Sequence, residues 1–193
     1  MDILKIIKEK ETSRKYKKKA ISKAIVNDII ESAVWGPSVH GKQPWRFVFV
    51  RDNSVLKKIA NYLLIESEKK GAGANILLHQ CSDVVAQCGL VVLAYTNGDF
   101  IKMVKRLTPS YGAIGKVTEL SSASAAIQNM VLTAESRGVS SCWFAVPLLC
   151  AKGLNEIAGE KDVELMALVA FGYSSERTRR TKRKDYSQII KEI

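Results

Sequence analysis

The sequence predicts an α+β fold in which a mixed central sheet is flanked by helices. Apolar residues at helical spacing alternate unevenly with short, continuous apolar runs that are typical of buried strands. The chain has 193 residues, of which 47% are hydrophobic and 25% charged, as in an ordinary globular protein. Because no linker or internal repeat divides it, residues 1–193 are expected to form a single domain.

The first half of the chain predicts two helices around one strand. Apolar residues recur at helical spacing over residues 21–34, and Gly36 is placed to end that helix. Residues 38–44 indicate a loop, and residues 46–50 then predict a strand. A second helix is expected to begin at Ser54, whose hydroxyl can cap it.

The middle of the chain contains more structure-breaking residues. Residues 71–75 are rich in glycine and indicate a loop, whereas residues 89–95 predict a buried strand. Residues 97–116 carry glycines and a proline with weak periodicity, as a mobile or variable segment would. Helical spacing returns over residues 121–137, and Gly138 is placed as the C-terminal stop.

The last part of the chain is expected to complete the sheet. Two strands are predicted near residues 141–146 and 164–171, with a short helix around residues 153–158 between them. The final stretch is basic and is expected to be an extended tail.

Several function classes have no signature in the sequence. It has no GxGxxG after a strand, no GxxxxGK[ST] phosphate loop and no GxSxG elbow. Its four cysteines form no CxxC pair and have no histidine at metal-ligand spacing, so neither a structural metal nor a disulfide framework is expected. No apolar run approaches the roughly 20 residues of a membrane-spanning helix. The N-terminus lacks the apolar block of a secretory signal, and the chain is expected to be cytoplasmic.

The formal net charge of +11 is concentrated in two clusters, residues 14–19 and residues 177–184. Such clusters attract phosphate groups, either of a nucleotide cofactor or of a nucleic acid. Each cluster can also be a solvated surface rim. Two clusters near opposite ends of the chain can converge in space on one anion.

Residues 37–45, Pro-Ser-Val-His-Gly-Lys-Gln-Pro-Trp, follow a predicted helix and precede a predicted strand. They resemble the PSxxNxQPW loop of the nitroreductase family. A loop bracketed by prolines can hold backbone N–H and C=O groups against a flavin ring, which tunes the cofactor without an acid–base side chain. A tight turn with Trp45 in the core is the alternative interpretation. His40 lies in this loop and is the candidate for a place near a ligand, whereas His79 is expected on the surface.

Three further segments resemble the same family in the same order along the chain. Residues 10–16 are similar to its RRSxRxF segment, whose basic side chains hold the phosphate of FMN. Residues 125–143 are similar to its AAAQNLLLAA…GLGSCW stretch, and residues 170–186 to its closing GY…RK-PL segment. The resemblance covers nearly the whole chain, apart from residues 52–80 and 97–116.

The resemblance implies an FMN-dependent oxidoreductase that takes hydride from NAD(P)H and passes it to a nitroaromatic, a quinone or an activated alkene. It also implies a homodimer with swapped terminal segments and with FMN sites at the interface, each drawing on both chains. Residues expected at the phosphate and ribityl chain are Lys10, Thr12, Arg14 and Arg183. Residues expected along the ring are Pro37, Ser38, Val39 and Gln43, with Asn75 at the pyrimidine edge. No catalytic residue is assigned, since solvent can protonate the product.

Three positions depart from the family pattern. Glu11 stands where a second arginine is common, Gly41 where asparagine is usual, and Thr181 where the residue is often basic. A specialised flavin enzyme of the same fold, such as a dehalogenase or a flavin-fragmenting synthase, and a non-catalytic flavin-binding protein are therefore alternatives. A basic nucleic-acid-binding module is the remaining alternative. Against it, Tyr16 is the main aromatic within the basic segments, and no helix-turn-helix or zinc pattern occurs.

Overall fold

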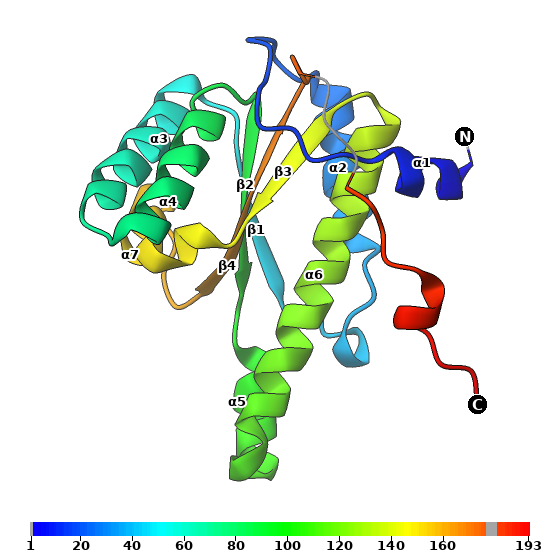
Figure 1. The fold of residues 1–193 in the computed structure, drawn as a ribbon. Coiled ribbons are helices and arrows are strands. Elements are labelled where there is room, and N and C mark those ends of the chain that lie inside the picture. The colour runs from blue at the N-terminus through cyan, green and yellow to red at the C-terminus, as the bar shows by residue number, and fades with distance from the viewer. Residues whose placement is uncertain (1, 177–180) are drawn as a thin grey trace.

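The computed structural model describes residues 2–176 and 181–193, and within these residues four strands form one sheet (Figure 1). The strands are β1 (Trp45–Val50), β2 (Leu90–Thr96), β3 (Ser140–Phe144) and β4 (Glu164–Gly172). Their order is β1-β2-β4-β3, and each neighbouring pair is antiparallel. In the described chain, parallel pairing is confined to an isolated bridge between Thr12 and Ser141, beside the edge strand β3. The predicted α+β class is confirmed, and the mixed character of the sheet is limited to that edge.

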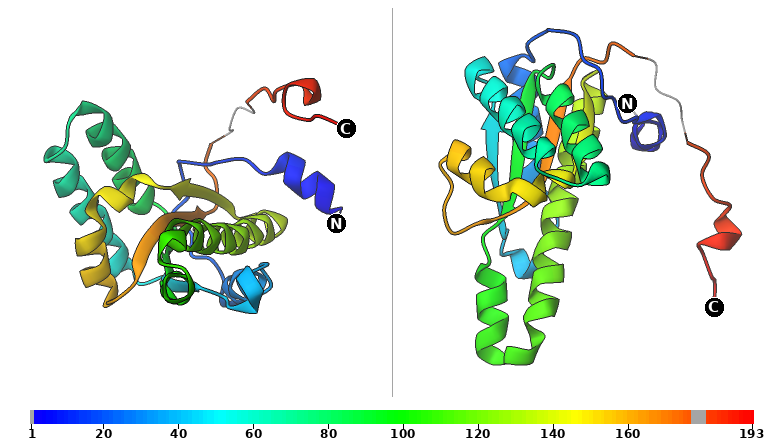
Figure 2. Two further views of the ribbon diagram at one scale, coloured as in Figure 1. Left: turned by 90° about the horizontal axis from the view of Figure 1, so that it is seen from below. Right: turned by 60° about the vertical axis from the view of Figure 1, so that its left-hand side comes forward.

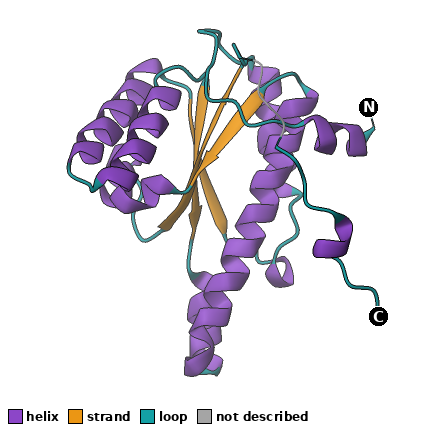
Figure 3. Cartoon of the chain, in the orientation of Figure 1, coloured by secondary structure: helices purple, strands orange, loops and turns teal. Residues whose placement is uncertain are grey.

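Helices cover both faces of the sheet (Figure 3). The helices are α1 (Ile3–Glu9), α2 (Lys23–Val34), α3 (Asn53–Glu68), α4 (Ala72–Val85), α5 (Asp99–Leu107), α6 (Gly112–Ser136) and α7 (Ala151–Ala158). Short 3-10 turns are η1 (Val39–Gly41), η2 (Pro109–Tyr111), η3 (Val146–Cys150) and η4 (Tyr186–Gln188). Helices α3, α4 and α7 pack on one face, and α2 and α6 pack on the other.

The central strand β2 connects the two halves of the core. All of its residues are buried, and successive side chains of a strand point to opposite faces. Val91 and Leu93 pack under α3 and α4, whereas Leu90 and Val92 pack under α2 and α6. A continuous apolar run is therefore what this doubly covered strand requires.

The prediction of an irregular segment over residues 97–116 is wrong. Helix α5 occupies its first part, and α6 begins at Gly112, well before the predicted start of that helix. The two helices form a hairpin that extends beyond the sheet (Figure 2). Gly112 and Gly115 serve its packing: a Cβ on Gly115 would lie 3.1 Å from the backbone of Ile101 in α5. These glycines permit close helix contact and do not break the helix.

Three smaller predictions also need correction. Helix α3 is capped by Asp52 and not by Ser54, because the Asp52 carboxylate accepts hydrogen bonds from the Ser54 and Val55 N–H groups. Residues 71–75 are not a loop, since α4 starts directly after Gly71. Strand β3 ends at Phe144, before the turn that contains Pro147. Positive φ at Gly138 confirms the predicted stop of α6.

Both chain ends lie on the side of the sheet that carries α6 (Figure 2). Helix α1 and residues 181–193 lie beside the body, and the residues of this tail are exposed. Residues 177–180 of the predicted basic cluster at residues 177–184 lie outside the described residues. The described cations of this cluster are Lys182, Arg183 and Lys184. None of the helices in the described ranges combines the length and apolar character that a bilayer crossing demands.

Candidate functional site

The N-terminal segment at residues 10–16 runs alongside the sheet and is fixed to it at two points. Thr12 forms the parallel bridge with Ser141 of β3, and Tyr16 forms an antiparallel bridge with Ser174. The Tyr16 ring is buried, and its hydroxyl donates to the carbonyl of Ala170 at 3.3 Å. Burial raises the pKa of Tyr16 above its ordinary value, so this hydroxyl stays protonated. The segment is therefore a fixed support for the side chains that it carries.

Alternate residues of this segment belong to two different surroundings, as expected for an extended chain. The Lys10 ammonium donates to the Thr12 hydroxyl at 3.3 Å. Glu11 and Ser13 instead line a cavity of about 390 Å³ together with Glu135 and other polar residues. The carboxylate at position 11 thus lies beside other carboxylates, and one of them, Glu135, also interacts with Lys10.

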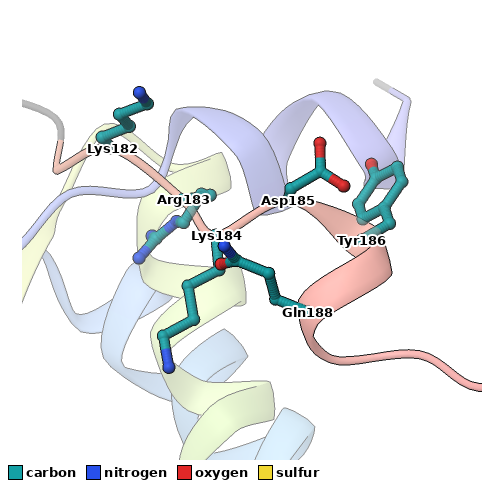
Figure 4. Close-up of a pocket in the computed structure, with 6 residues that line it drawn as sticks. All are labelled: Lys182, Arg183, Lys184, Asp185, Tyr186 and Gln188. Carbon is teal, nitrogen blue, oxygen red and sulfur yellow. The ribbon is translucent and has the colours of Figure 1, made fainter.

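The tail brings a further cation to this region. Burial lowers the pKa of Lys10, and the nearby Arg183 guanidinium lowers it further, whereas Glu135 opposes both effects. Arg183 lines a cavity of about 640 Å³, in which its side chain and that of Lys184 point away from Asp185 and Tyr186 (Figure 4). Its guanidinium donates to the Thr181 hydroxyl at 3.5 Å. We use the name phosphate cluster for the four residues that the sequence predicts at the phosphate and ribityl chain of FMN, Lys10, Thr12, Arg14 and Arg183.

Glu176 ties the N-terminal segment to the stretch that follows β4. Its carboxylate accepts hydrogen bonds from the backbone N–H groups of Arg14 at 2.6 Å and Lys15 at 3.1 Å, and from the Ser13 hydroxyl at 3.3 Å. The hydrogen bond from the Arg14 N–H is the main reason why the pKa of Glu176 is lowered. Sequence reasoning missed Ser13 and Glu176, because no local pattern reports a contact between positions 162 residues apart.

The loop at residues 37–43 has an unusual backbone. His40, Gly41 and Gln43 have φ values of 45°, 67° and 47°, in the left-handed region that side chains other than glycine and asparagine rarely adopt. Gly41, which replaces the asparagine usual in the family, suits that conformation. The substitution therefore keeps the shape of the backbone and removes only a side chain. Two non-glycine residues held in this region mark a place where the surrounding structure fixes the loop.

Hydrogen bonds and close packing hold the 37–43 loop on α6. The Val39 N–H donates to the Ser122 hydroxyl oxygen at 3.2 Å, and the Gln43 N–H donates to the Ser38 hydroxyl oxygen at 3.2 Å. Gly36 precedes the loop, and a Cβ there would lie 2.8 Å from the Ala126 Cα. Sequence reasoning missed the roles of Gly36 and Ser122, because helical periodicity identifies a helix but not its partner.

His40 and His79 lie in different surroundings, and the predicted surface position of His79 is confirmed. The His40 ring lies 6.0 Å from the Phe100 ring, centroid to centroid, so it connects the 37–43 loop to α5. His79 is exposed on α4 and lies 3.4 Å from the Asp83 carboxylate, as a surface residue would. In the described ranges, no group of three His, Cys, Asp or Glu side chains is placed to hold a metal ion.

Asn75 lies apart from the other candidate residues. It is in α4, on the opposite face of the sheet from α6 and the 37–43 loop. Its amide donates to the Ser67 carbonyl at 2.9 Å and so joins α4 to α3. Within one chain, Asn75 lies away from both the phosphate cluster and the 37–43 loop. Its contact with a flavin stays a prediction.

The predicted site residues form two groups within one chain. Ser122, which holds the 37–43 loop, and Glu135, which faces Lys10, both belong to α6. Their spacing along the helix corresponds to roughly 20 Å at a rise of about 1.5 Å per residue. The phosphate cluster and the group Pro37, Ser38, Val39 and Gln43 are thus each assembled, but at separate places.

The fold is shared with solved proteins of the nitroreductase type. An FMN-dependent nitroreductase from Clostridium difficile R20291 has the same fold, with a TM-score of 0.69 at 18% identity, covering 97% of each chain. The model of the nitroreductase family matches residues 7–173. The chain belongs to the nitroreductase family.

Two archaeal relatives have names that assign them provisionally as NADH dehydrogenases/NAD(P)H nitroreductases. The relative from Methanothermobacter thermautotrophicus is 24% identical over 146 residues, which span 76% of this chain and 62% of that protein. The relative from Archaeoglobus fulgidus is 25% identical over 175 residues, which span 89% of this chain and 85% of that protein. The match thus covers less than two thirds of the first relative and most of the second.

Proposed function

We propose that this chain is an FMN-dependent oxidoreductase that takes hydride from NAD(P)H and passes it to an electron-poor acceptor such as a nitroaromatic, a quinone or an activated alkene. It acts as a cytoplasmic homodimer with two flavin sites. The observation that carries the proposal is the 37–43 loop, whose left-handed residues are fixed against α6 in a chain of the nitroreductase family.

The phosphate cluster fits the anionic end of FMN. Lys10, Arg14 and Arg183 supply cations, and Thr12 supplies a hydroxyl donor beside Lys10. Charge-assisted hydrogen bonds to phosphate are among the stronger polar interactions in proteins. The cost of burying Lys10, which its lowered pKa reports, is offset when a phosphate dianion joins the cluster.

The 37–43 loop fits the flavin ring. Its side chains are mostly small or apolar, and hydrogen bonds to Ser38 and Ser122 hold its backbone in place. FMN supplies the N5 position that accepts and donates hydride. The residues of the loop hold the ring edge, exclude water and fix nearby dipoles, and a base is not required among them.

Exposed apolar side chains support a homodimer. Trp35, at the end of α2 beside the loop, is 79% exposed, and α1 and the tail also expose large apolar residues. These residues are Ile3, Leu4, Ile7, Tyr186, Ile189 and Ile190. Exposed apolar patches of this extent mark interaction surfaces. A second copy that covers them, with exchanged terminal segments, would bring the phosphate cluster of one chain to the 37–43 loop of the other.

A visible absorption spectrum tests the flavin chemistry directly. The purified protein is incubated with FMN, desalted and mixed with NADH or NADPH without oxygen. We expect the flavin band to be retained and then to bleach. A retained band that neither nucleotide bleaches would contradict the reductase and favour a flavin-binding protein or another flavin chemistry. Loss of all flavin on desalting would contradict the cofactor assignment.

A mixed dimer tests whether each site draws on two chains. One chain carries Lys10→Gln with Arg183→Gln, and the other carries Val39→Pro, which removes the N–H that meets Ser122. In a two-chain site, both homodimers retain little flavin, but the mixed dimer keeps one complete site and one doubly damaged site. We expect about half of the wild-type flavin content. If each site were built from one chain, the mixed dimer would retain no more flavin than the two homodimers.

A further inference from the structure

A further cavity, separate from the residues proposed to bind flavin, lies at the junction of three segments. It measures about 380 Å³ and is bounded by residues 18–20, the first turn of α3 and the turn after α4. None of the residues that line it belongs to the phosphate cluster or to the 37–43 loop. Its volume is in the range of small-molecule sites, which is about 300–1,000 Å³. The basic run at residues 14–19, which the flavin site uses only in part, contributes one wall.

Three lysines give this cavity its charge. Lys18, Lys19 and Lys57 all line it, and none of them takes part in an ion pair within the described ranges. The Lys19 ammonium lies 4.4 Å from the centroid of the Tyr173 ring, a cation–π contact with a residue that packs on the other face of the sheet and does not line the cavity. Three positive charges at one concave surface attract an anion.

The described residues that line the cavity include no carboxylate. Asp52, next to Asn53, keeps its negative charge while it caps α3 through the Ser54 and Val55 N–H groups, and it offsets only part of the charge of the three lysines. The Cys88 thiol also lines the cavity, and burial raises its pKa to about 12, so it carries no negative charge at neutral pH. The cavity is therefore positive as a whole.

The remaining walls suit an uncharged organic group. Ala86 supplies exposed apolar surface above the buried side chains of Leu56 and Val85, and Asn53 and Gln87 supply amides. The cavity is closed on one side because Gly89 lets the chain approach: a Cβ there would lie 3.1 Å from the Lys19 carbonyl oxygen. A few polar groups above an apolar wall are the usual composition of a site for a small organic ligand.

We propose that this cavity binds a small phosphorylated compound with an uncharged body, of the size of a mononucleotide. The lysines hold the phosphate groups, and the apolar wall with its two amides holds the body. A nucleic acid strand is the less favoured ligand, because it follows an open groove with aromatic side chains, whereas this site is concave and its lining residues include no aromatic ring. The proposal does not depend on the chemistry of the flavin site.

Calorimetric titration of the FMN-loaded protein with ADP tests the proposal, with adenosine and inorganic phosphate as partial ligands. We expect saturable binding of ADP and binding at least about tenfold weaker for each partial ligand. The charge variant is Lys18→Gln with Lys57→Gln. The matched control is Lys152→Gln with Lys161→Gln, which removes the same charge from exposed positions elsewhere. The charge variant is expected to weaken ADP binding by at least about tenfold, and the control by less than about twofold.

A second variant, Ala86→Trp, fills the cavity and leaves every charge in place. It is expected to abolish ADP binding while the flavin band and its reduction stay unchanged. Absence of saturable ADP binding to the wild type, or equal losses in the charge variant and its control, would overturn the proposal. Undiminished ADP binding by Ala86→Trp would do the same. Binding of a short oligothymidylate that is lost in the charge variant but kept in Ala86→Trp, without ADP binding, would show a surface for polyanions instead.

Discussion

The 37–43 loop and the phosphate cluster are built in opposite ways. The loop is contiguous in sequence and is shaped by its backbone, with three left-handed residues and N–H groups tied to Ser38 and Ser122. The phosphate cluster is made of side chains from two segments near opposite ends of the chain. The Glu176 carboxylate, which accepts hydrogen bonds from the Arg14 and Lys15 N–H groups, joins the N-terminal segment to the chain that follows β4.

This difference predicts that the two regions respond differently to substitution. Removing a cation from the phosphate cluster changes the attraction for an anion but leaves the backbone in place. Changing the support of the 37–43 loop alters the position of the backbone groups themselves, and with it both stability and flavin chemistry. The variants below test that contrast.

The largest effect is expected at Gly36. Gly36→Ala places a Cβ 2.8 Å from the Ala126 Cα, and neither backbone can move without separating the loop from α6. We expect the free energy of unfolding to fall by about 1–3 kcal/mol, as in other overpacked sites, and the flavin to be lost on desalting. Urea denaturation and the flavin absorbance of the desalted protein measure the two effects.

Gly73→Ala is the matched control for Gly36→Ala. Gly73 lies in α4, and a Cβ there meets nothing within 4 Å. Alanine is a better helix former than glycine, so this variant is expected to gain up to about 1 kcal/mol of stability. Equal stability of the two variants would contradict the close contact between Gly36 and Ala126.

Loss of a cation from the phosphate cluster is expected to act on affinity alone. Lys10→Gln removes one charge-assisted hydrogen bond, which is worth about 1.5–3 kcal/mol, so the Kd for FMN should rise about ten- to hundredfold. Fluorescence titration of FMN measures it, and Lys152→Gln on α7 is the control. A wild-type Kd for Lys10→Gln would remove Lys10 from the site.

The 37–43 loop could be predicted from the sequence better than the residues that hold it in place. The physical reason is that a loop is indicated by neighbouring residues, whereas its partners are distant in the sequence. Residues 37–43 contain Pro37 and Gly41 and are followed by Pro44, so they were recognisable as a loop between a helix and a strand, although the left-handed conformation of His40 and Gln43 was not. The partners Gly36 and Ser122 were missed because the contact between residues 36–39 and α6 depends on tertiary packing. Most strands and helices were predicted for the same local reason.

The largest errors in the predicted secondary structure occurred at glycines that lie within helices and do not form turns. Gly112 and Gly115 suggested an irregular segment, yet they lie in the first turns of α6 and face α5. Gly73 also lies in a stretch that was predicted as a loop, but no close packing requires it, and it is tolerated in the first turn of α4. A single sequence reports the backbone freedom of glycine but not the neighbour that requires a missing side chain.

A smaller effect is expected for the hydrogen bond that holds the loop. Ser122→Ala removes the acceptor of the Val39 N–H and should lower the free energy of unfolding by about 0.5–1.5 kcal/mol. Because the loop position changes, the rate of flavin reduction by NADH in stopped-flow measurements should fall, with the Kd for FMN changed less than in Lys10→Gln. Ser121→Ala is the control, since that exposed hydroxyl donates only to the Val117 carbonyl of its own helix. Equal effects of the two serine variants would show that the loop does not depend on Ser122.

The smallest effect concerns the pH dependence of Glu176. Hydrogen bonds from the Arg14 and Lys15 N–H groups hold the pKa of this carboxyl below its ordinary value of 4.5. A carboxyl whose pKa is lowered in the folded state contributes stability that is complete at a pH above 4.5. This stability is lost as the pH falls through the pKa of the folded state. Glu176→Gln should therefore be less stable than the wild type at pH 7, and the gap should narrow below about pH 4.5. Thermal unfolding of both proteins between pH 3 and pH 7 measures this gap; a gap of constant size would show that the Glu176 carboxylate does not stabilise the junction between the two distant segments.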